Sequence, residues 1–465
     1  MLNAVQRQMV KLGGMLAVGT IGTFASLAHA QTGQFDDAQE NFKSYVVTVC
    51  GTLRDSERTT VQNDLFLRCN AALQQPDDPA LTAKSTILDQ YVGVQNIAQQ
   101  SDGALQSAKP GRAIAGRIGA VAEQVRGRQF AAATRPILLA SNNPDEVSIG
   151  SLERPSALDG FLSIGGFDSE QDSTARELGF EQDGWYIAGG LDYMFSSKMT
   201  AGVALNYVTS EADFDGIGDL PSGGSMDTDS WMLSGYGVYA PTDRLVVTGL
   251  IGFGQTDYDN TRRISLEDRN ALSSTPNLSN DSQFFGTIDR TATSSTNADT
   301  AQLSVGASYA AWSSGATNFT PSADLSYYTA SIDGFTETGS DGLDLEFDEQ
   351  NVDSVQFSIG GELSHAISTE TAVFVPYARA RAIFELQDNA QSVSARYVAT
   401  EGIASIQNQR FTVSTNPADD NSYEFAVGAS MVRPNGLAGF VEFQTVAGLD
   451  NVDYKSVSAG LRIRF

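Results

Sequence analysis

From about residue 158 to the end of the chain, apolar and polar residues alternate with a period of two. Between Trp185 and Phe195 the odd positions are mostly apolar or aromatic, and the even positions are mostly small or polar. The same parity returns in residues 201–207, 303–309, 355–363 and 423–431. This period predicts β-strands with one face in an apolar environment and the other face in a polar one.

Twelve such segments can be counted, and their length favours a membrane barrel over a soluble sheet. They centre near residues 163, 190, 204, 234, 251, 306, 325, 359, 380, 427, 442 and 459. Each is about ten residues or longer, which suits a tilted membrane crossing, whereas soluble strands average about five or six residues. We predict an all-β transmembrane barrel of about 12 antiparallel strands over residues 151–465, preceded by a small α-helical N-terminal region.

The connections between these segments alternate between long and short along the chain. The long ones are residues 169–183, 210–227, 259–299, 332–350 and 389–419. The short ones include residues 196–198, residues 241–243 and the tight-turn sequence Pro434-Asn435-Gly436. Outer-membrane barrels have short periplasmic turns and longer extracellular loops, so we expect the long connections at the cell surface.

Residues 1–30 have the pattern of a cleaved secretion signal. Arg7 and Lys11 precede an apolar stretch from Leu12 to Leu27, and Ala28-His29-Ala30 is a small-x-small cleavage site. The alternative is a retained membrane anchor, for which the apolar stretch is short. We therefore expect a mature protein that begins near Gln31.

Residues 31–150 are predicted to form a short helical passenger or plug region and a linker. Helical spacing runs through residues 35–70, where Gly51 is the expected break between two helices. Cys50 and Cys69, the only cysteines, would then lie near the ends of these helices. Because an exported protein matures in an oxidising compartment, we predict a disulfide between them; the alternative is two buried free thiols. Further helical stretches are expected at residues 81–105 and 112–133.

The composition argues against several classes of function. The formal net charge is −27, which disfavours nucleic-acid binding, and much of the acid lies in predicted loops such as residues 211–229 and 333–349. His365 is the only histidine after the predicted signal. No nucleophile elbow, phosphate-binding loop or histidine-based metal motif occurs in a suitable context. We expect no catalytic residue, no metal, no cofactor and no nucleic-acid partner.

The final strand carries the most specific pattern. Apolar side chains at odd positions end in the terminal Phe465, and we assign Leu461, Ile463 and Phe465 as a barrel assembly signal. The even positions carry Arg462 and Arg464, which need a polar interior.

Residues 420–465 resemble the end of the autotransporter β-domain, the translocator of type V secretion. The resemblance rests on Phe425-Ala426-Val427-Gly428-Ala429, on Val441-Glu442-Phe443 and on Ala459-Gly460-Leu461-Arg462-Ile463-Arg464-Phe465. Upstream, Val375-Pro376-Tyr377-Ala378-Arg379 is similar to the Pro-Tyr-aliphatic-Arg strand of the family. The resemblance covers about 300 residues and is strongest in roughly the last hundred. One departure is that the region before the barrel is short and helical and lacks the β-helix repeats of family passengers.

The resemblance implies a monomeric twelve-stranded barrel in the bacterial outer membrane, with the chain entering from the periplasm. It implies as partners the outer-membrane lipid, the barrel assembly machinery and periplasmic chaperones. It also implies that the segment before the barrel threads the pore. The predicted helix 112–133 is the expected plug, and its basic residues are Arg112, Arg117, Arg126 and Arg128.

The strand parity predicts which charged side chains face the lumen. The even face carries Asp192, Asp324, Glu362, Glu424, Glu442, Arg462 and Arg464. In the ninth strand the register switches, so that Arg379, Arg381 and Glu385 are expected to point inward. A lumen with charges of both signs can hydrate a pore, form ion pairs with a plug helix or simply fill a polar interior.

These patterns predict an autotransporter-type barrel that translocates or displays its short N-terminal segment. The alternative is an outer-membrane channel or an adhesin that acts through its large extracellular loops, with the helical segment as a pore plug. An enzyme is the least favoured class.

Overall fold

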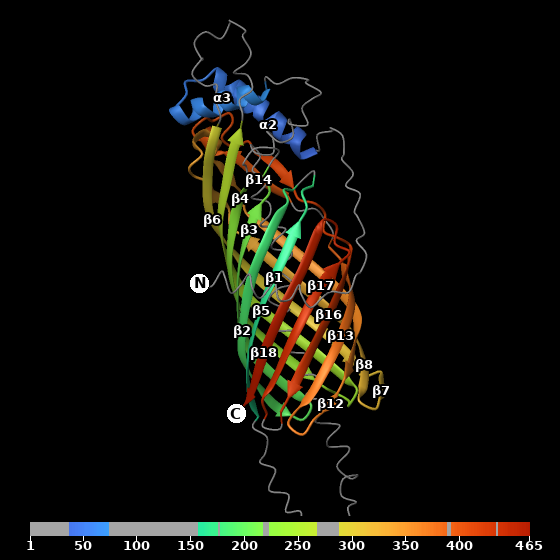
Figure 1. The fold of residues 1–465 in the computed structure, drawn as a ribbon. Helices are drawn as coiled ribbons and strands as arrows, with labels where there is room; N and C mark the ends of the chain where they lie inside the picture. The colour runs from blue at the N-terminus through green and yellow to red at the C-terminus, as the bar shows by residue number, and fades with distance from the viewer. Residues whose placement is uncertain are drawn as a thin grey trace, which may run out of the picture.

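The computed structural model describes residues 37–73, 157–174, 177–216, 223–266, 288–387, 392–433 and 436–465. Twelve long antiparallel strands form a closed barrel (Figure 1). Each strand pairs with the next long strand, and the last pairs with the first. The strands are β1 (Leu158–Gln171), β2 (Phe180–Ser196), β3 (Met199–Phe214), β4 (Gly223–Tyr239), β5 (Leu245–Leu266), β6 (Ile288–Tyr309), β8 (Thr317–Ile332), β11 (Gln350–His365), β13 (Val373–Glu385), β16 (Asn421–Val432), β17 (Ala438–Ala447) and β18 (Val452–Arg464).

The twelve-stranded antiparallel barrel predicted from the sequence is confirmed. Two short strands, β7 (Trp312–Ser314) and β12 (Ile367–Ser368), extend the turns at the end of the barrel that also holds Leu158 and Phe465. Within the described ranges, no helix combines the length and the apolar character needed to cross a membrane.

Several predicted long loops prove to be strand. β5 and β6 each have 22 residues and pair without interruption from Leu245↔Tyr309 to Leu266↔Ile288. Residues 259–266 and 288–299, about half of the predicted loop 259–299, therefore belong to these strands. The acidic residues 211–214 and 223–229, also expected in a loop, lie in β3 and β4. The prediction was wrong here because the outer face of these extensions is polar. Alternation of apolar and polar residues, the signal used to find strands, therefore disappears.

The connections 332–350 and 389–419, also predicted as loops, contain a second sheet. Its strands, in spatial order, are β15 (Phe411–Ser414), β14 (Ser392–Tyr397), β10 (Leu345–Phe347) and β9 (Phe335–Thr336). Two 3₁₀ turns, η3 (Asp341–Leu343) and η4 (Val398–Thr400), flank it. These strands are two to six residues long, too short to give a periodic sequence signal.

The N-terminal region contains helices α2 (Asp37–Arg54) and α3 (Thr60–Leu73). The break lies at residues 55–59, so the expectation that Gly51 separates the helices was wrong. Thr59 starts α3 with a capping box: its hydroxyl accepts the Gln62 N–H at 3.3 Å, and the Gln62 amide oxygen accepts the Thr59 N–H at 3.0 Å. A capping box gives a helix start enough local stability to place the break there.

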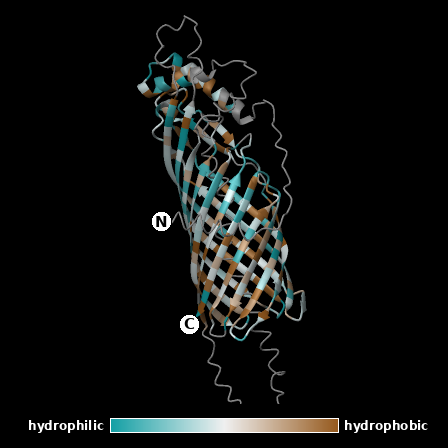
Figure 2. Cartoon of the chain, viewed as in Figure 1, coloured by the Kyte–Doolittle hydropathy of each residue, from teal (hydrophilic) through white to brown (hydrophobic). Residues whose placement is uncertain are grey.

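The outward-facing side chains form an apolar band around the barrel, as Figure 2 shows by the gathering of hydrophobic colours on its wall. Trp231, Tyr239, Trp312, Tyr207 and Tyr327 are among the exposed aromatic residues of this surface. Exposed apolar side chains on a closed barrel are stable in lipid, and aromatic residues favour the membrane–water interface.

The interior is less polar than the strand parity predicted. Inward-facing aromatic residues pack in clusters, such as Phe161 with Tyr236 and Phe167 with Tyr186 and Tyr454. A further cluster lines the taller wall of β2–β6 and includes Phe180, Tyr258 and Tyr328. Even positions face inward in most strands, as predicted, but β1 has the opposite parity. Large aromatic side chains also fill part of the space assigned to polar groups.

Candidate functional site

The helices α2 and α3 lie across the end of the barrel from which the long connections emerge (Figure 1). We call the assembly of α2, α3, the second sheet, η3 and η4 the cap. One hydrophobic core joins its parts and extends to Ile264 and Ile288 at the ends of β5 and β6. The helices are therefore packed onto the long connections through buried side chains.

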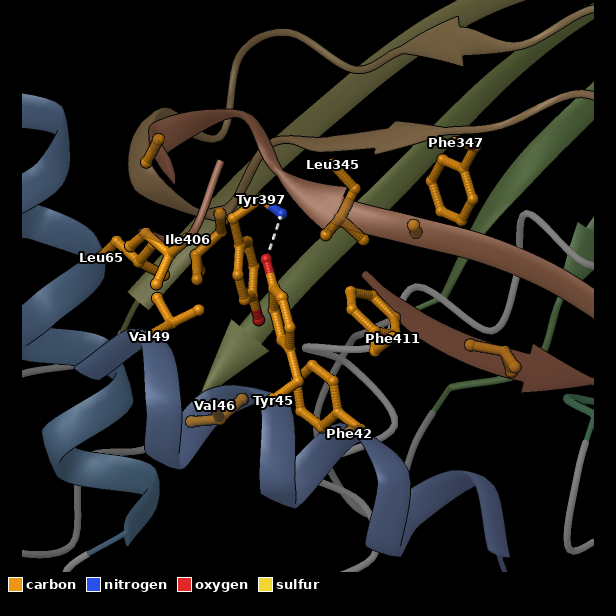
Figure 3. Close-up of a cluster of buried hydrophobic side chains, with 14 of the residues drawn as sticks. Phe42, Tyr45, Val46, Val49, Leu65, Leu345, Phe347, Tyr397, Ile406 and Phe411 are labelled. Carbon is orange, nitrogen blue, oxygen red and sulfur yellow. Dashed lines mark hydrogen bonds between the residues drawn. The ribbon is translucent and has the colours of Figure 1, made fainter. Parts of the chain in front are cut away.

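Aromatic rings form the centre of the cap core (Figure 3). Phe42 and Tyr45 from α2 pack on Phe411, with ring centroids 4.9 and 5.1 Å away. Tyr45 also stacks on Tyr397 at 6.1 Å. Val49 and Leu53 continue the same face of α2 and are fully buried. The spacing of these residues along α2 matches one face of a helix, which explains why α2 buries this stripe.

A buried hydrogen bond crosses the centre of this core. The Tyr45 hydroxyl accepts the backbone N–H of Tyr397 at 3.0 Å, and both residues are buried. Burial raises the pKa of Tyr45 to about 12, although the hydrogen bond from Tyr397 and the nearby charges of Arg396 and Arg410 act in the opposite direction. The backbone N–H of Tyr397, in the second sheet, thus finds its hydrogen-bond acceptor on a side chain of α2.

Asp64 forms the polar clip between α3 and the barrel. Arg290 of β6 donates to its carboxylate from both terminal nitrogens, at 2.6 and 3.0 Å, and the N–H of Gly342 donates at 3.1 Å. Burial raises the pKa of this carboxyl, but the hydrogen bonds and charge of Arg290, the charge of Arg68 and the Gly342 N–H outweigh it, so the net pKa is lowered. The clip thus favours the ionised carboxylate.

A second ion pair fixes the second sheet to the barrel wall. Arg262 of β5 donates to the Glu337 carboxylate at 2.8 Å and to the carbonyl oxygen of Leu343 at 2.9 Å. The Glu337 carboxylate also accepts the N–H of Leu345 at 3.0 Å. Both side chains are about 98% buried or more, with exposed fractions of 2% and 1%. Separating the two partners would leave a buried charge without compensation, which is strongly destabilising, so the ion pair holds the connection in one position.

The lumen charges of β13, β16 and β17 form one network. Arg381 lies 2.6 Å from Glu424, and Arg379 lies 3.0 Å from Glu442. Tyr377 donates to Glu442 at 2.9 Å, which keeps the odd positions of β13 inside. The structure thus brings four of the predicted lumen charges together, on the side of β13 that the register switch predicted.

A separate cluster joins the first and last strands. Asp159 of β1 lies 2.7 Å from Arg462 and 3.2 Å from Arg464. Both arginines were predicted to face the lumen, but Asp159 was not. In β1 the odd positions face inward and Leu162 and Ile164 face lipid, so the even-position rule could not identify it.

The remaining predicted lumen residues are spread over other strands. Asp192 accepts a hydrogen bond from Tyr236 at 3.1 Å, and Asp324 accepts one from Ser358 at 3.4 Å. Glu362 lies directly across the strand pair from Arg379.

The predicted assembly signal lies on the opposite face of β18 from the arginines. Leu461, Ile463 and Phe465 are all more than half exposed, on the lipid-facing side. Cys50 is buried in the cap core and disulfide-bonded. The side chain of Cys69 lies outside the described residues, so the Cys50–Cys69 pairing stays a prediction. The expected plug residues Arg112, Arg117, Arg126 and Arg128, and the predicted helix 81–105, also lie outside them.

A closed antiparallel barrel with a lipid-facing apolar wall and a charged interior defines an outer-membrane β-barrel. A family model described as "Autotransporter beta-domain" matches residues 161–444, which is more than half of the chain. The chain belongs to this family, and it is an outer-membrane autotransporter barrel. The expected family is thereby confirmed.

Known proteins show similarity at a lower level. Esterase EstA of Pseudomonas aeruginosa and Esterase EstA of Pseudomonas putida are each 25% identical over 316 residues, covering 66% of this chain and 42% of theirs. The chain thus spans less than half the length of these relatives.

Solved translocator structures are also similar. The translocator domain of the autotransporter NalP from Neisseria meningitidis is 16% identical, covers 75% of this chain and 98% of that one, and has a TM-score of 0.48. The transport unit of AIDA-I from Escherichia coli is 13% identical, covers 72% and 98%, and has a TM-score of 0.45.

Proposed function

We propose that this barrel displays its own N-terminal helical pair on the cell surface and keeps it docked there. The observation that carries the proposal is the cap core, in which α2 and α3 share buried contacts with the connections between the barrel strands. A passenger that is released has no need of a hydrophobic docking surface on its own translocator. The retained pair would protect apolar side chains such as Tyr397 and Phe411 from water.

The sidedness follows from the barrel itself. The short turns, the start of β1 and Phe465 share one end, and the cap lies at the other. Since outer-membrane barrels keep short turns in the periplasm, we place the cap on the cell surface. An exported chain reaches the periplasm first, so the proposal includes the cleaved signal of residues 1–30 and assembly by periplasmic chaperones and the barrel assembly machinery.

The positions of the described residues on either side of residues 74–156 support the proposal that this segment passes through the pore. Leu73 ends α3 at the cap, and Leu158 begins β1 at the opposite end of the barrel. In a membrane the polar route between these ends is the lumen, because lipid does not accommodate an irregular backbone. We propose that residues 74–156 take this route, with Arg112, Arg117, Arg126 and Arg128 facing lumen carboxylates.

We further propose that the protein works as a monomeric display barrel without enzyme activity of its own. The similarity to Esterase EstA covers 42% of that protein, so its activity does not transfer with the match. His365 accepts or donates a hydrogen bond with Thr317 at 2.7 Å, near the short turns and far from the cap. A hydrolytic triad at the cap would need a histidine there.

The test is surface access on intact cells. An epitope tag between Asp55 and Ser56, in the α2–α3 turn, should be labelled by antibody on intact cells and should stay with the membrane fraction. A control tag in the short turn at Thr242 should be labelled only after the outer membrane is permeabilised. If antibody does not label the α2–α3 tag on intact cells, display is contradicted. Release of the tag into the medium would contradict retention.

A further inference from the structure

The closure of the barrel depends on the pairing of strands that lie at opposite ends of its sequence. β1 and β18 pair from Asp159↔Arg464 to Gln171↔Val452. This seam joins the first and the last of the twelve long strands, so it can form only when the strands between them are in place. Its backbone ladder does not by itself select a register, since a shift by two residues keeps the same faces inward.

Asp159 sits where this seam meets the short-turn end. It is 5% exposed and points into the barrel. The Nη2 of Arg462 donates to one of its carboxylate oxygens at 2.7 Å, and the Nε of Arg464 donates to the other at 3.2 Å. Arg464 is the direct register partner of Asp159, and Arg462 lies opposite Phe161. One carboxylate therefore spans two arginines on the same face of β18.

This arrangement is specific for one register. If β18 slid by two residues along β1, one of the two arginines would move out of reach of Asp159. An arginine that loses its partner in a buried position is strongly disfavoured. The ion pairs therefore supply the register information that the backbone ladder lacks.

We propose that Asp159 is the latch that closes the barrel, acting as a positioning residue on Arg462 and Arg464. The two faces of β18 then serve different steps. The outward residues Leu461, Ile463 and Phe465 present the strand for insertion, and the inward arginines seal it against β1. This inference concerns barrel closure and does not depend on display of the helical pair.

The test compares Asp159→Asn with Asp192→Asn. Asp192 is the direct partner of Asp159 on β2, is equally buried and accepts a hydrogen bond from Tyr236, but it lies one strand away from the seam. Both variants carry Ile164→Cys and Ala459→Cys, at directly opposite positions across the seam, so that a disulfide reports closure. A pulse-labelled time course follows membrane insertion and cross-linking separately.

Asp159→Asn should insert at the normal rate but should cross-link roughly tenfold more slowly, because the two arginines lose a buried partner. Asp192→Asn should match the parent in both measurements, and Asp159→Glu should recover most of the cross-linking rate. Normal cross-linking in Asp159→Asn, or an equal delay in Asp192→Asn, would overturn the latch.

If Asp159→Asn does not insert, a variant with Arg462→Gln and Arg464→Gln added removes the uncompensated charges. Recovery of insertion with slow cross-linking supports the latch. Failure of this variant as well shows that the cluster acts before closure and overturns the proposal.

Discussion

Replacing Tyr45 by Phe tests whether α2 is docked on the second sheet as a single core. The ring contacts with Phe411 and Tyr397 stay, but the hydroxyl that accepts the Tyr397 N–H at 3.0 Å is lost. The N–H would remain buried without an acceptor, at a cost of about 1–3 kcal/mol. That cost raises the population of the undocked helical pair by about 5- to 150-fold.

The assay is trypsin cleavage of the purified barrel in detergent at native conditions. The Arg54 side chain is 70% exposed, but cleavage there requires α2 to unfold locally. When opening is fast compared with cleavage, the rate follows the open population, so Tyr45→Phe should be cleaved faster by the same factor. Tyr193→Phe, on the lipid-facing wall of the barrel, is the control and should leave the rate unchanged.

The pH dependence supplies a second readout of the same contact. The pKa of Tyr45 is raised from 10.0 to about 12, so the docked state favours the neutral phenol. The contribution of the neutral phenol to docking stability is complete below pH 10 and is lost as the pH rises toward 12. The parent should lose protection over this range, and the difference from Tyr45→Phe should shrink. Equal cleavage of the two proteins at neutral pH would refute the docking argument.

Three further changes probe the cap and its rim. Because the pKa of Asp64 is lowered, its ionised carboxylate stabilises docking at pH values above the ordinary pKa of 3.8. This stabilisation is lost as the pH falls through the lowered pKa. The protection of the α2–α3 pair from trypsin should therefore weaken in acid. Asp64→Asn should remove this pH dependence and raise the cleavage rate at neutral pH. Gly342→Ala places a Cβ 2.5 Å from the Leu65 nitrogen and 2.8 Å from the Val61 carbonyl oxygen, so the cap should undock in the same assay while the barrel keeps its heat-modifiable gel mobility. Burial, together with the charges of Asp450 and Asp420, outweighs the hydrogen bond from the Asp450 N–H and raises the pKa of Asp419 from 3.8 to about 6. Asp419→Asn should increase thermal stability at pH 8, and the gain should shrink as the pH falls through 6 and be absent below 3.8.

The sequence alone was sufficient to predict the barrel, because lipid imposes a period of two on every crossing strand. The twelve predicted centres all fall within the twelve long strands. The even parity assigned Glu424 and Glu442 to the inside, and the predicted register switch in the ninth strand assigned Arg379 and Arg381 there. The structure pairs these four residues. Solvent and lipid act on each residue separately, so such assignments need only the local pattern.

The cap could not be predicted from the alternation of apolar and polar residues. Its strands are too short for a period, and its contacts join residues far apart in the chain, such as Asp64 with Arg290 and Tyr45 with Tyr397. The role of Asp159 can be seen only from the pairing of β1 with β18, the first and last strands of the barrel. The sequence determined where each strand crosses the membrane and which face it turns to lipid. Only the tertiary structure decided which distant side chains meet, because that depends on barrel closure and on the docking of α2 and α3, which no local pattern encodes.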